Sequence, residues 1–250
     1  MNFNNLIFSL REYCAEASHK YYSESRRYGG YTFCGYLTFN EIAFKLAMLV
    51  DREFENLSDF KSVVRDSLNG HYDYYLTKRL DYESGSVVTK ATNEFLCRLD
   101  AANENEVPKN DSYYRVIYNK EAETIIARFK TVWHYDTSYW FPLNADYPKE
   151  IREKIFVTEK NAAPKMDSII ALAQKNGKRV YRYGECDYPL CYCEETDDLY
   201  EHGIEQAYTD KDFSWFIYFS HEGTVAFAGS ILPEIRKIFA DELINKWDFE

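Results

Sequence analysis

Glycine, proline and long apolar runs are all scarce in this chain of 250 residues. Its 10 glycines and 6 prolines exclude collagen-like and low-complexity chains. The longest uninterrupted apolar runs are five residues, as in 215–219, whereas a membrane-spanning helix needs about 20. No basic segment leads into an apolar one at the N-terminus, so no secretory signal is expected. We therefore expect a soluble cytoplasmic protein that does not contact a membrane.

Basic residues are in deficit, and one segment accounts for the whole deficit. The formal net charge is −11, from 30 basic and 41 acidic residues. Residues 184–234 hold twelve acids and a single base, Lys211, which leaves 29 residues of each sign elsewhere. We call residues 184–234 the acidic segment. It would repel phosphate backbones and attract cationic partners through long-range steering, which predicts a basic protein partner and no nucleic acid.

Aromatic residues are interleaved with these acids at Tyr188, Tyr192, Tyr200, Tyr208, Phe213 and Trp215. A disordered acidic tail would lack them, whereas protein interfaces combine aromatic anchors with charged surroundings. The alternative is an ordinary solvated surface, because acids also increase solubility. The contact residues predicted for a partner are Tyr192, Glu194, Glu195, Asp197, Asp198 and Tyr200.

The leading hypothesis is a protein-binding module that presents an acidic, aromatic-rich face to a basic partner. An inhibitor or immunity-type protein that masks a cationic active site is its concrete form. A scaffold whose helical N-terminal region makes the contacts is a further alternative. The sequence holds no P-loop, nucleophile elbow, dinucleotide-binding glycine pattern, H-E-x-x-H or EF-hand spacing. We therefore favour a protein without enzymatic activity over an enzyme, and we expect no cofactor.

Apolar residues recur at helical spacing in the N-terminal part of the chain. They predict a helix over residues 3–26, followed by a glycine-marked loop over 29–35. Thr38 and Glu41 have the spacing of a capping box and predict a helix start there. Ser58 predicts the N-cap of a helix that ends near residues 69–70.

The remaining elements follow from periodicity and turn residues. We expect helices over 75–80, 87–99, 165–175 and 233–247, a linker over 101–111, a strand over 178–183, and hairpins over 113–118 with 124–133 and over 215–220 with 224–228. The fold class is α+β, in which a helical region, 1–105, precedes a small, mainly antiparallel sheet packed with helices, 106–250. The two regions form either separate domains or one continuous core.

A competing hypothesis is an enzyme or small-ligand protein centred on His134 and Asp136. On a strand these two residues share a face, so Asp136 can orient the imidazole as an acid or a base. Nearby aromatic residues would enclose the pair in a pocket: Trp133, Tyr135, Tyr139, Trp140, Phe141 and Tyr147. The alternative is a structural histidine at the end of a strand, whose side chain only bonds to its neighbour.

Two further sets of chemically versatile residues carry no site prediction. His221 and Glu222 occupy the tip of the second hairpin, but neighbours on an extended segment diverge, so they are not expected to form a dyad. Three thiols, Cys186, Cys191 and Cys193, have poor spacing for zinc, with His202 as the only nearby fourth ligand. No metal site is therefore predicted, and Cys191 and Cys193 are expected to be core thiols.

Overall fold

The computed structural model describes residues 1–28, 33–68, 82–109, 113–136, 140, 148, 150–184, 190–194 and 205–240. The chain divides into two compact units, Met1–Arg115 and Val116–Glu250. Helices dominate the first unit, and the second combines an antiparallel sheet with helices, so the α+β class is confirmed. Among the described residues no helix has the length and apolarity that crossing a membrane requires.

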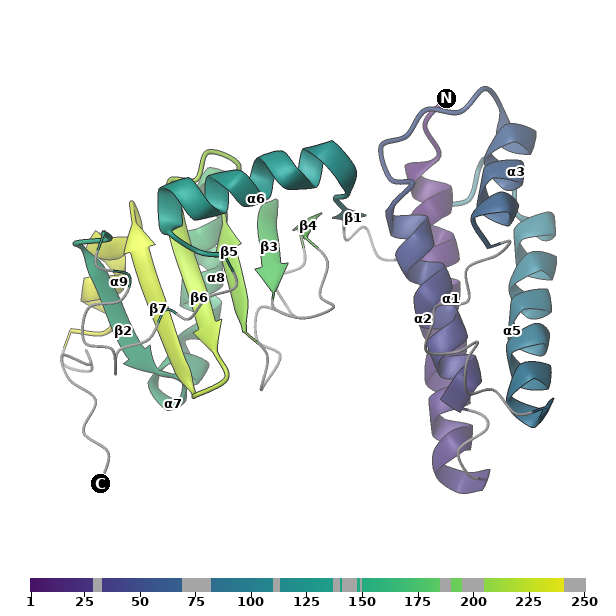
Figure 1. Ribbon diagram of the computed structural model, residues 1–250, viewed down its shortest axis with the longest axis horizontal. Coiled ribbons are helices and arrows are strands. Elements are labelled where there is room, and N and C mark those ends of the chain that lie inside the picture. Colours follow the sequence, from purple (N-terminus) through teal and green to yellow (C-terminus); the bar gives the residue numbers. More distant parts are fainter. Residues whose placement is uncertain are drawn as a thin grey trace. The chain divides into compact units, whose positions relative to one another are not determined.

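Two long helices, α1 (Asn4–Tyr28) and α2 (Phe33–Ala47), lie side by side in the first unit (Figure 1). The helix predicted over 3–26 is confirmed by α1. Gly35 lies within α2 and not in the predicted loop, and a Cβ at this position would lie 2.1 Å from Cδ1 of the buried Tyr21. The missing side chain therefore allows the Tyr21 ring to pack directly on the α2 backbone.

The two predicted N-caps are wrong by part of a turn or more. Thr38 lies in the middle of α2, where its hydroxyl donates to the Cys34 carbonyl at 2.7 Å. The apolar stripe of α2 begins upstream of the capping-box residues, so the helix continues through them. In α3 (Leu57–Leu68) the capping contact comes from Asn56, whose Oδ1 accepts the Asp59 amide at 3.0 Å, and Ser58 lies inside the first turn.

The helix predicted over 87–99 is confirmed as part of α5 (Tyr82–Ala101), and the one expected over 75–80 lies outside the described residues. The segment that follows α5, expected to be a linker, is bonded to the helices of the first unit. Glu106 accepts hydrogen bonds from Arg98 and from Ser9. The Lys61 ammonium donates to the Ala102 carbonyl at 2.7 Å. Whether the two units are separate domains stays a prediction.

The sheet has seven strands among the described residues: β1 (Tyr114–Val116), β2 (Lys154–Thr158), β3 (Val180–Gly184), β4 (Cys191–Cys193), β5 (Gln206–Thr209), β6 (Trp215–Ser220) and β7 (Thr224–Gly229). Their order is β1-β4-β3-β5-β6-β7-β2, and the pairs from β4 through to β2 are antiparallel. The strand over 178–183 and the hairpin of β6 with β7 are confirmed. Ser220 pairs with Thr224 across the turn of that hairpin.

The hairpin predicted over 113–133 is wrong, because its second half is the helix α6 (Asn119–Trp133). β-branched and aromatic residues suggested a strand there. The buried residues are instead Ile125, Phe129 and Trp133, every fourth along the chain, while Val132 is 37% exposed. A spacing of four places residues on one face of a helix, so periodicity outweighs composition here.

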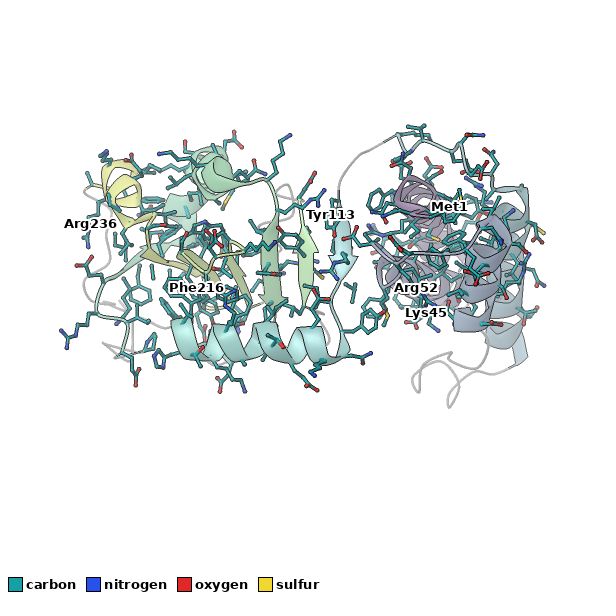
Figure 2. All side chains as sticks on the ribbon, turned by 90° about the horizontal axis from the view of Figure 1, so that it is seen from above. Met1, Lys45, Arg52, Tyr113, Phe216 and Arg236 are labelled. Atoms are coloured by element: carbon teal, nitrogen blue, oxygen red, sulfur yellow. The ribbon has the colours of Figure 1, made fainter. Side chains whose placement is uncertain are left out.

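Helices cover both faces of the sheet. Figure 2 shows α6 along one face and α8 (Met166–Ala173) with α9 (Leu232–Ile238) on the other. Phe216 lies between the sheet and α6, with its ring centroid 5.5 Å from that of Trp133 and 4.5 Å from that of Trp140. On the opposite face Phe239, just after α9, packs on Phe227 at 5.9 Å.

The predicted helix over 165–175 is confirmed by α8 and the short turns that flank it. The last predicted helix begins as expected, with Pro233 in the first turn of α9, where its fixed φ is compatible with a helix. Residues beyond 240 lie outside the described part of the chain. The β6–β7 turn therefore lies at one end of a hairpin whose strands are part of a sheet covered by helices (Figure 1).

Candidate functional site

The turn between β6 and β7 contributes two side chains to the one group of three His, Cys, Asp or Glu residues whose polar atoms lie within 4.8 Å of one another among the described residues. It consists of His221, Glu222 and Gly223, and Gly223 takes a φ of 76°, which favours glycine. The Gly223 amide donates to the Ser220 carbonyl at 3.0 Å and closes the turn. This turn joins two buried strands, so its backbone is held firmly at both ends.

Glu205 reaches the same place from the neighbouring strand. It immediately precedes β5, whose residue Gln206 pairs with Phe219 of β6, so Glu205 lies beside the end of β6. Its side chain is completely buried. The His221 Nδ1 lies 3.1 Å from a Glu205 oxygen, and the Nε2 lies 3.1 Å from a Glu222 oxygen. The imidazole is thus placed between two carboxylates, and we call Glu205, His221 and Glu222 the hairpin-tip cluster.

Neighbouring hydroxyl groups surround the hairpin-tip cluster. Burial, followed by the nearby Glu205 carboxylate that its hydroxyl contacts, raises the pKa of Tyr218 far above its ordinary value. Ser220 donates its hydroxyl hydrogen to Glu222, and the Glu222 amide donates back to the Ser220 oxygen at 3.2 Å. Tyr218 therefore remains a neutral donor at physiological pH, and Ser220 restricts the Glu222 carboxylate.

The expectation that His221 and Glu222 do not form a dyad is wrong, because their side chains lie 3.1 Å apart. It assumed an extended segment, in which neighbouring side chains point to opposite faces. Both residues lie in a tight turn, where the backbone reverses and brings the two side chains together. Glu205 was not singled out from the sequence. The signal that could have identified it is that Glu205 directly precedes β5, a strand without charged residues.

The structure does not place His134 and Asp136 on a strand. His134 is the C-cap of α6, with a left-handed φ of 50°, and both side chains are exposed while Tyr135 between them is buried. The expected alternation along a strand therefore does not apply to this pair. Burial, followed by the Asp136 charge, raises the pKa of Tyr183, so Asp136 lies near β3.

The aromatic residues around His134 fill the core. Trp133, Tyr135 and Trp140 all pack against Phe216. Each of the three is at most 6% exposed. Tyr139, Phe141 and Tyr147 lie outside the described residues. The described rings therefore stabilise the contact between α6 and the sheet, and their arrangement is that of a packed core.

Two of the predicted partner contacts are described. Tyr192 and Glu194 line a depression of about 420 Å³, in which a Glu194 oxygen lies 2.7 Å from Nε of Arg179. Its other lining residues are Gly177, Lys178, Asp210, Lys211 and Asp212, so charges of both signs meet there. Glu195, Asp197, Asp198 and Tyr200 lie outside the described residues.

Three of the aromatic residues expected to be surface anchors are core residues. Tyr208 and Trp215 are 1% exposed and Phe213 is 4% exposed. Tyr188, like Tyr200, lies outside the described residues, and Tyr192 is half-buried. Packing in the core of the sheet therefore explains the aromatic residues of β5, of β6 and of the segment that connects them. They provide no evidence for a docking surface.

Cys191 and Cys193 are buried free thiols on the same face of β4, while Tyr192 between them packs against Tyr181 on the other face, with the two rings tilted by 40°. Cys186 and His202, the remaining members of the rejected zinc set, lie outside the described residues.

Comparisons of the chain with protein-family models, with curated proteins and with solved structures find no match.

Proposed function

We propose that this protein is a binding module for a basic protein partner. The observation that carries the proposal is the concentration of twelve acids and one base in residues 184–234. Charge of one sign on a surface raises the rate at which an oppositely charged partner associates, and it disfavours partners of like charge. An inhibitor or immunity-type protein that covers a cationic active site is the concrete form of this function.

The contacts of the described acids refine where the partner would dock. Glu194 pairs with Arg179, and Glu234 pairs with Lys237 at 2.9 Å. Glu205 and Glu222 belong to the hairpin-tip cluster, and Asp210 accepts the Ser214 amide at 2.6 Å. These acids have internal roles. We therefore assign the docking charge to the acids that remain of the predicted contact set, Glu195, Asp197 and Asp198, with Tyr192 and Tyr200 as aromatic contacts.

A charge-matched pair of triple variants tests this assignment. The docking variant carries Glu195→Gln, Asp197→Asn and Asp198→Asn. The control carries Glu104→Gln, Glu123→Gln and Glu153→Gln, which are exposed acids far from the acidic segment in the sequence. Both lose three negative charges, so the net charge of the molecule changes equally and only the location of the lost charge differs. Glu194→Gln alone tests whether the acid paired with Arg179 contributes.

The experiment is affinity capture from host lysate at low and moderate salt, followed by association kinetics with the captured protein. We expect a basic protein that the wild type and the control retain and the docking variant releases. Its association rate constant should fall roughly tenfold for the docking variant at low salt. Equal retention by all variants would overturn the proposal. Capture that all of these variants retain but a chain lacking residues 1–100 loses would favour the helical N-terminal region as the scaffold.

A further inference from the structure

We propose that Glu205, His221 and Glu222 form a binding site for a divalent transition-metal ion. The site lies at the turn between β6 and β7, away from the residues assigned to partner docking in the sequence. It goes beyond the proposed function, and neither inference depends on the other. The ligands would be one carboxylate oxygen from each glutamate and one imidazole nitrogen.

The spacing of the ligand atoms fits such an ion. One ligand atom from each of the three residues lies within 4.8 Å of the other two. The two 3.1 Å contacts of the imidazole use different ring nitrogens, Nδ1 toward Glu205 and Nε2 toward Glu222, so the nitrogen that binds the ion can keep only one of them. Ligands that bind Zn²⁺ at about 2.0–2.2 Å in tetrahedral geometry are roughly 3.3–3.6 Å apart. One carboxylate is therefore already at a suitable distance from the imidazole, and rotation of the partly exposed His221 and Glu222 side chains would bring the second carboxylate to the same nitrogen.

One of the three side chains is buried and fixed, and the other two are partly exposed, so an ion could reach the site from solvent. Glu205 is completely buried, whereas the side chains of His221 and Glu222 are 38% and 33% exposed. The buried carboxylate belongs to the residue directly before β5, and the other two ligands come from the β6–β7 turn, so the pairing of β5 with β6 sets their separation. Three protein ligands leave a remaining coordination position open to water, as in catalytic zinc sites.

The hydroxyl groups around the cluster act as outer-shell partners. Ser220 bonds to Glu222, and the Tyr218 hydroxyl contacts Glu205. Hydrogen bonds of this kind orient metal-binding carboxylates and commonly alter affinity by roughly 10- to 100-fold. The two glutamates thus have their carboxylates positioned before an ion arrives.

A second, independent observation comes from Thr224. It pairs with Ser220 across the turn and is 1% exposed, and among the described residues its Oγ1 makes no hydrogen bond. Cross-strand partners lie on the same face of a sheet, so this hydroxyl and that of Ser220 share one face beside the cluster. A buried hydroxyl without a partner is unfavourable. A water molecule bound to the ion would satisfy it.

The local charge also favours a cation. Two carboxylates share one imidazole, and the Glu159 carboxylate lies near the same turn, 3.6 Å from where a Cβ on Gly223 would be. The acidic segment that contains all three ligands holds only one basic residue, Lys211, which lines the depression beside Asp210 and Asp212. Excess negative charge around a fixed group of donors attracts positive ions.

The donor set selects the class of ion. Imidazole nitrogen with carboxylate oxygen suits Zn²⁺, Co²⁺ and Ni²⁺, whereas Ca²⁺ and Mg²⁺ prefer oxygen ligands throughout. We therefore expect Zn²⁺ and its spectroscopic substitute Co²⁺ to bind, with Mg²⁺ at equal concentration producing little effect. No thiolate is required, so binding should survive alkylation of the exposed Cys97.

The test uses the full chain, stripped with a chelator, and titrates it with Zn²⁺ by calorimetry and with Co²⁺ by visible absorption. We expect one ion for each chain. His221→Gln and Glu222→Gln should each weaken Zn²⁺ binding at least roughly tenfold. His19→Gln and Glu104→Gln, which remove the same chemical groups from exposed positions elsewhere, should bind like the wild type.

Glu205→Gln is the most informative variant but lies in the core, so circular dichroism must first show that it folds. The Glu222→Gln variant keeps the test decisive if Glu205→Gln does not fold, because Glu222 is partly exposed. Absence of Zn²⁺ and Co²⁺ binding to the wild type would overturn the proposal. Wild-type affinity in both His221→Gln and Glu222→Gln would also overturn it, because the ion would then bind elsewhere. Neither result would affect partner capture.

Discussion

The Arg98 guanidinium donates to both carboxylate oxygens of Glu106. The Ser9 hydroxyl adds a bond of 2.9 Å to the same carboxylate, and the Asn103 amide adds one of 3.1 Å. Three parts of the first unit are thereby joined: α1, the end of α5 and the segment after it. Paired, two-pronged bonds of this type are stronger than neutral hydrogen bonds and fix the relative orientation of the two groups.

Glu106→Gln should destabilise the first unit by about 1–3 kcal/mol, because it removes a charged partner from a largely buried Arg98. The matched control is Glu104→Gln, an exposed acid two residues away, which should change the free energy of unfolding by less than about 0.5 kcal/mol. Urea denaturation of both variants measures the difference. Equal effects of the two substitutions would show that the pair contributes nothing specific.

The same pair predicts an acid-dependent loss of stability. The hydrogen bond from Arg98 lowers the pKa of Glu106 below its ordinary value. A lowered pKa in the folded state contributes stability above the pKa of the unfolded state, about 4.3, and that contribution is lost as the pH falls through the folded value. The Glu106→Gln variant should therefore show a weaker fall in melting temperature below about pH 4 than the wild type.

Tyr21 predicts the opposite pH response at the alkaline end. Burial, followed by the Glu94 carboxylate to which its hydroxyl donates at 3.3 Å, raises the pKa of Tyr21 to about 12. A raised pKa contributes stability below the unfolded value of about 10, which is lost as the pH rises toward the folded value. Tyr21→Phe should remove part of the stability loss between about pH 10 and 12. Tyr22→Phe, an exposed neighbour, is the control in alkaline melts.

Two helical glycines should respond in opposite directions to alanine. At Gly35 a Cβ would meet the Tyr21 ring at 2.1 Å, so Gly35→Ala should destabilise the α1–α2 contact by about 2 kcal/mol or more. At Gly85 in α5 nothing lies within 4 Å of the added carbon, so Gly85→Ala should stabilise the protein by about 0.5–1 kcal/mol. Thermal melts compare the two, and equal shifts would contradict the packing at Gly35.

Elements with clear local periodicity could be predicted from the sequence. The stripe of α1 and the turn signal at Gly223 are short-range features, and neighbouring residues suffice to produce them. At α6 the composition of the segment conflicted with its spacing, and burial of Ile125, Phe129 and Trp133 followed the spacing. Thr38 had the spacing of a capping box, yet the apolar stripe of α2 extended past it.

The candidate site could be predicted only in part. His221 and Glu222 were visible as a pair at a hairpin tip, but their mutual orientation depended on turn geometry. Glu205 lies well upstream in the chain and meets them only because β5 pairs with β6. Similarly, the aromatic side chains of Tyr208, Phe213 and Trp215 were assigned to a surface, because composition alone does not distinguish a core strand from a docking face.

The α+β class, the β6–β7 hairpin, the main N-terminal helices and the concentration of acid in residues 184–234 could all be predicted from the sequence alone. Each depends on local spacing or on simple counting. The burial of particular aromatic residues, the pair of Glu194 with Arg179 and the contact of Glu205 with His221 became visible only in the three-dimensional fold. Those relationships depend on strand pairing between distant segments, which no local pattern encodes.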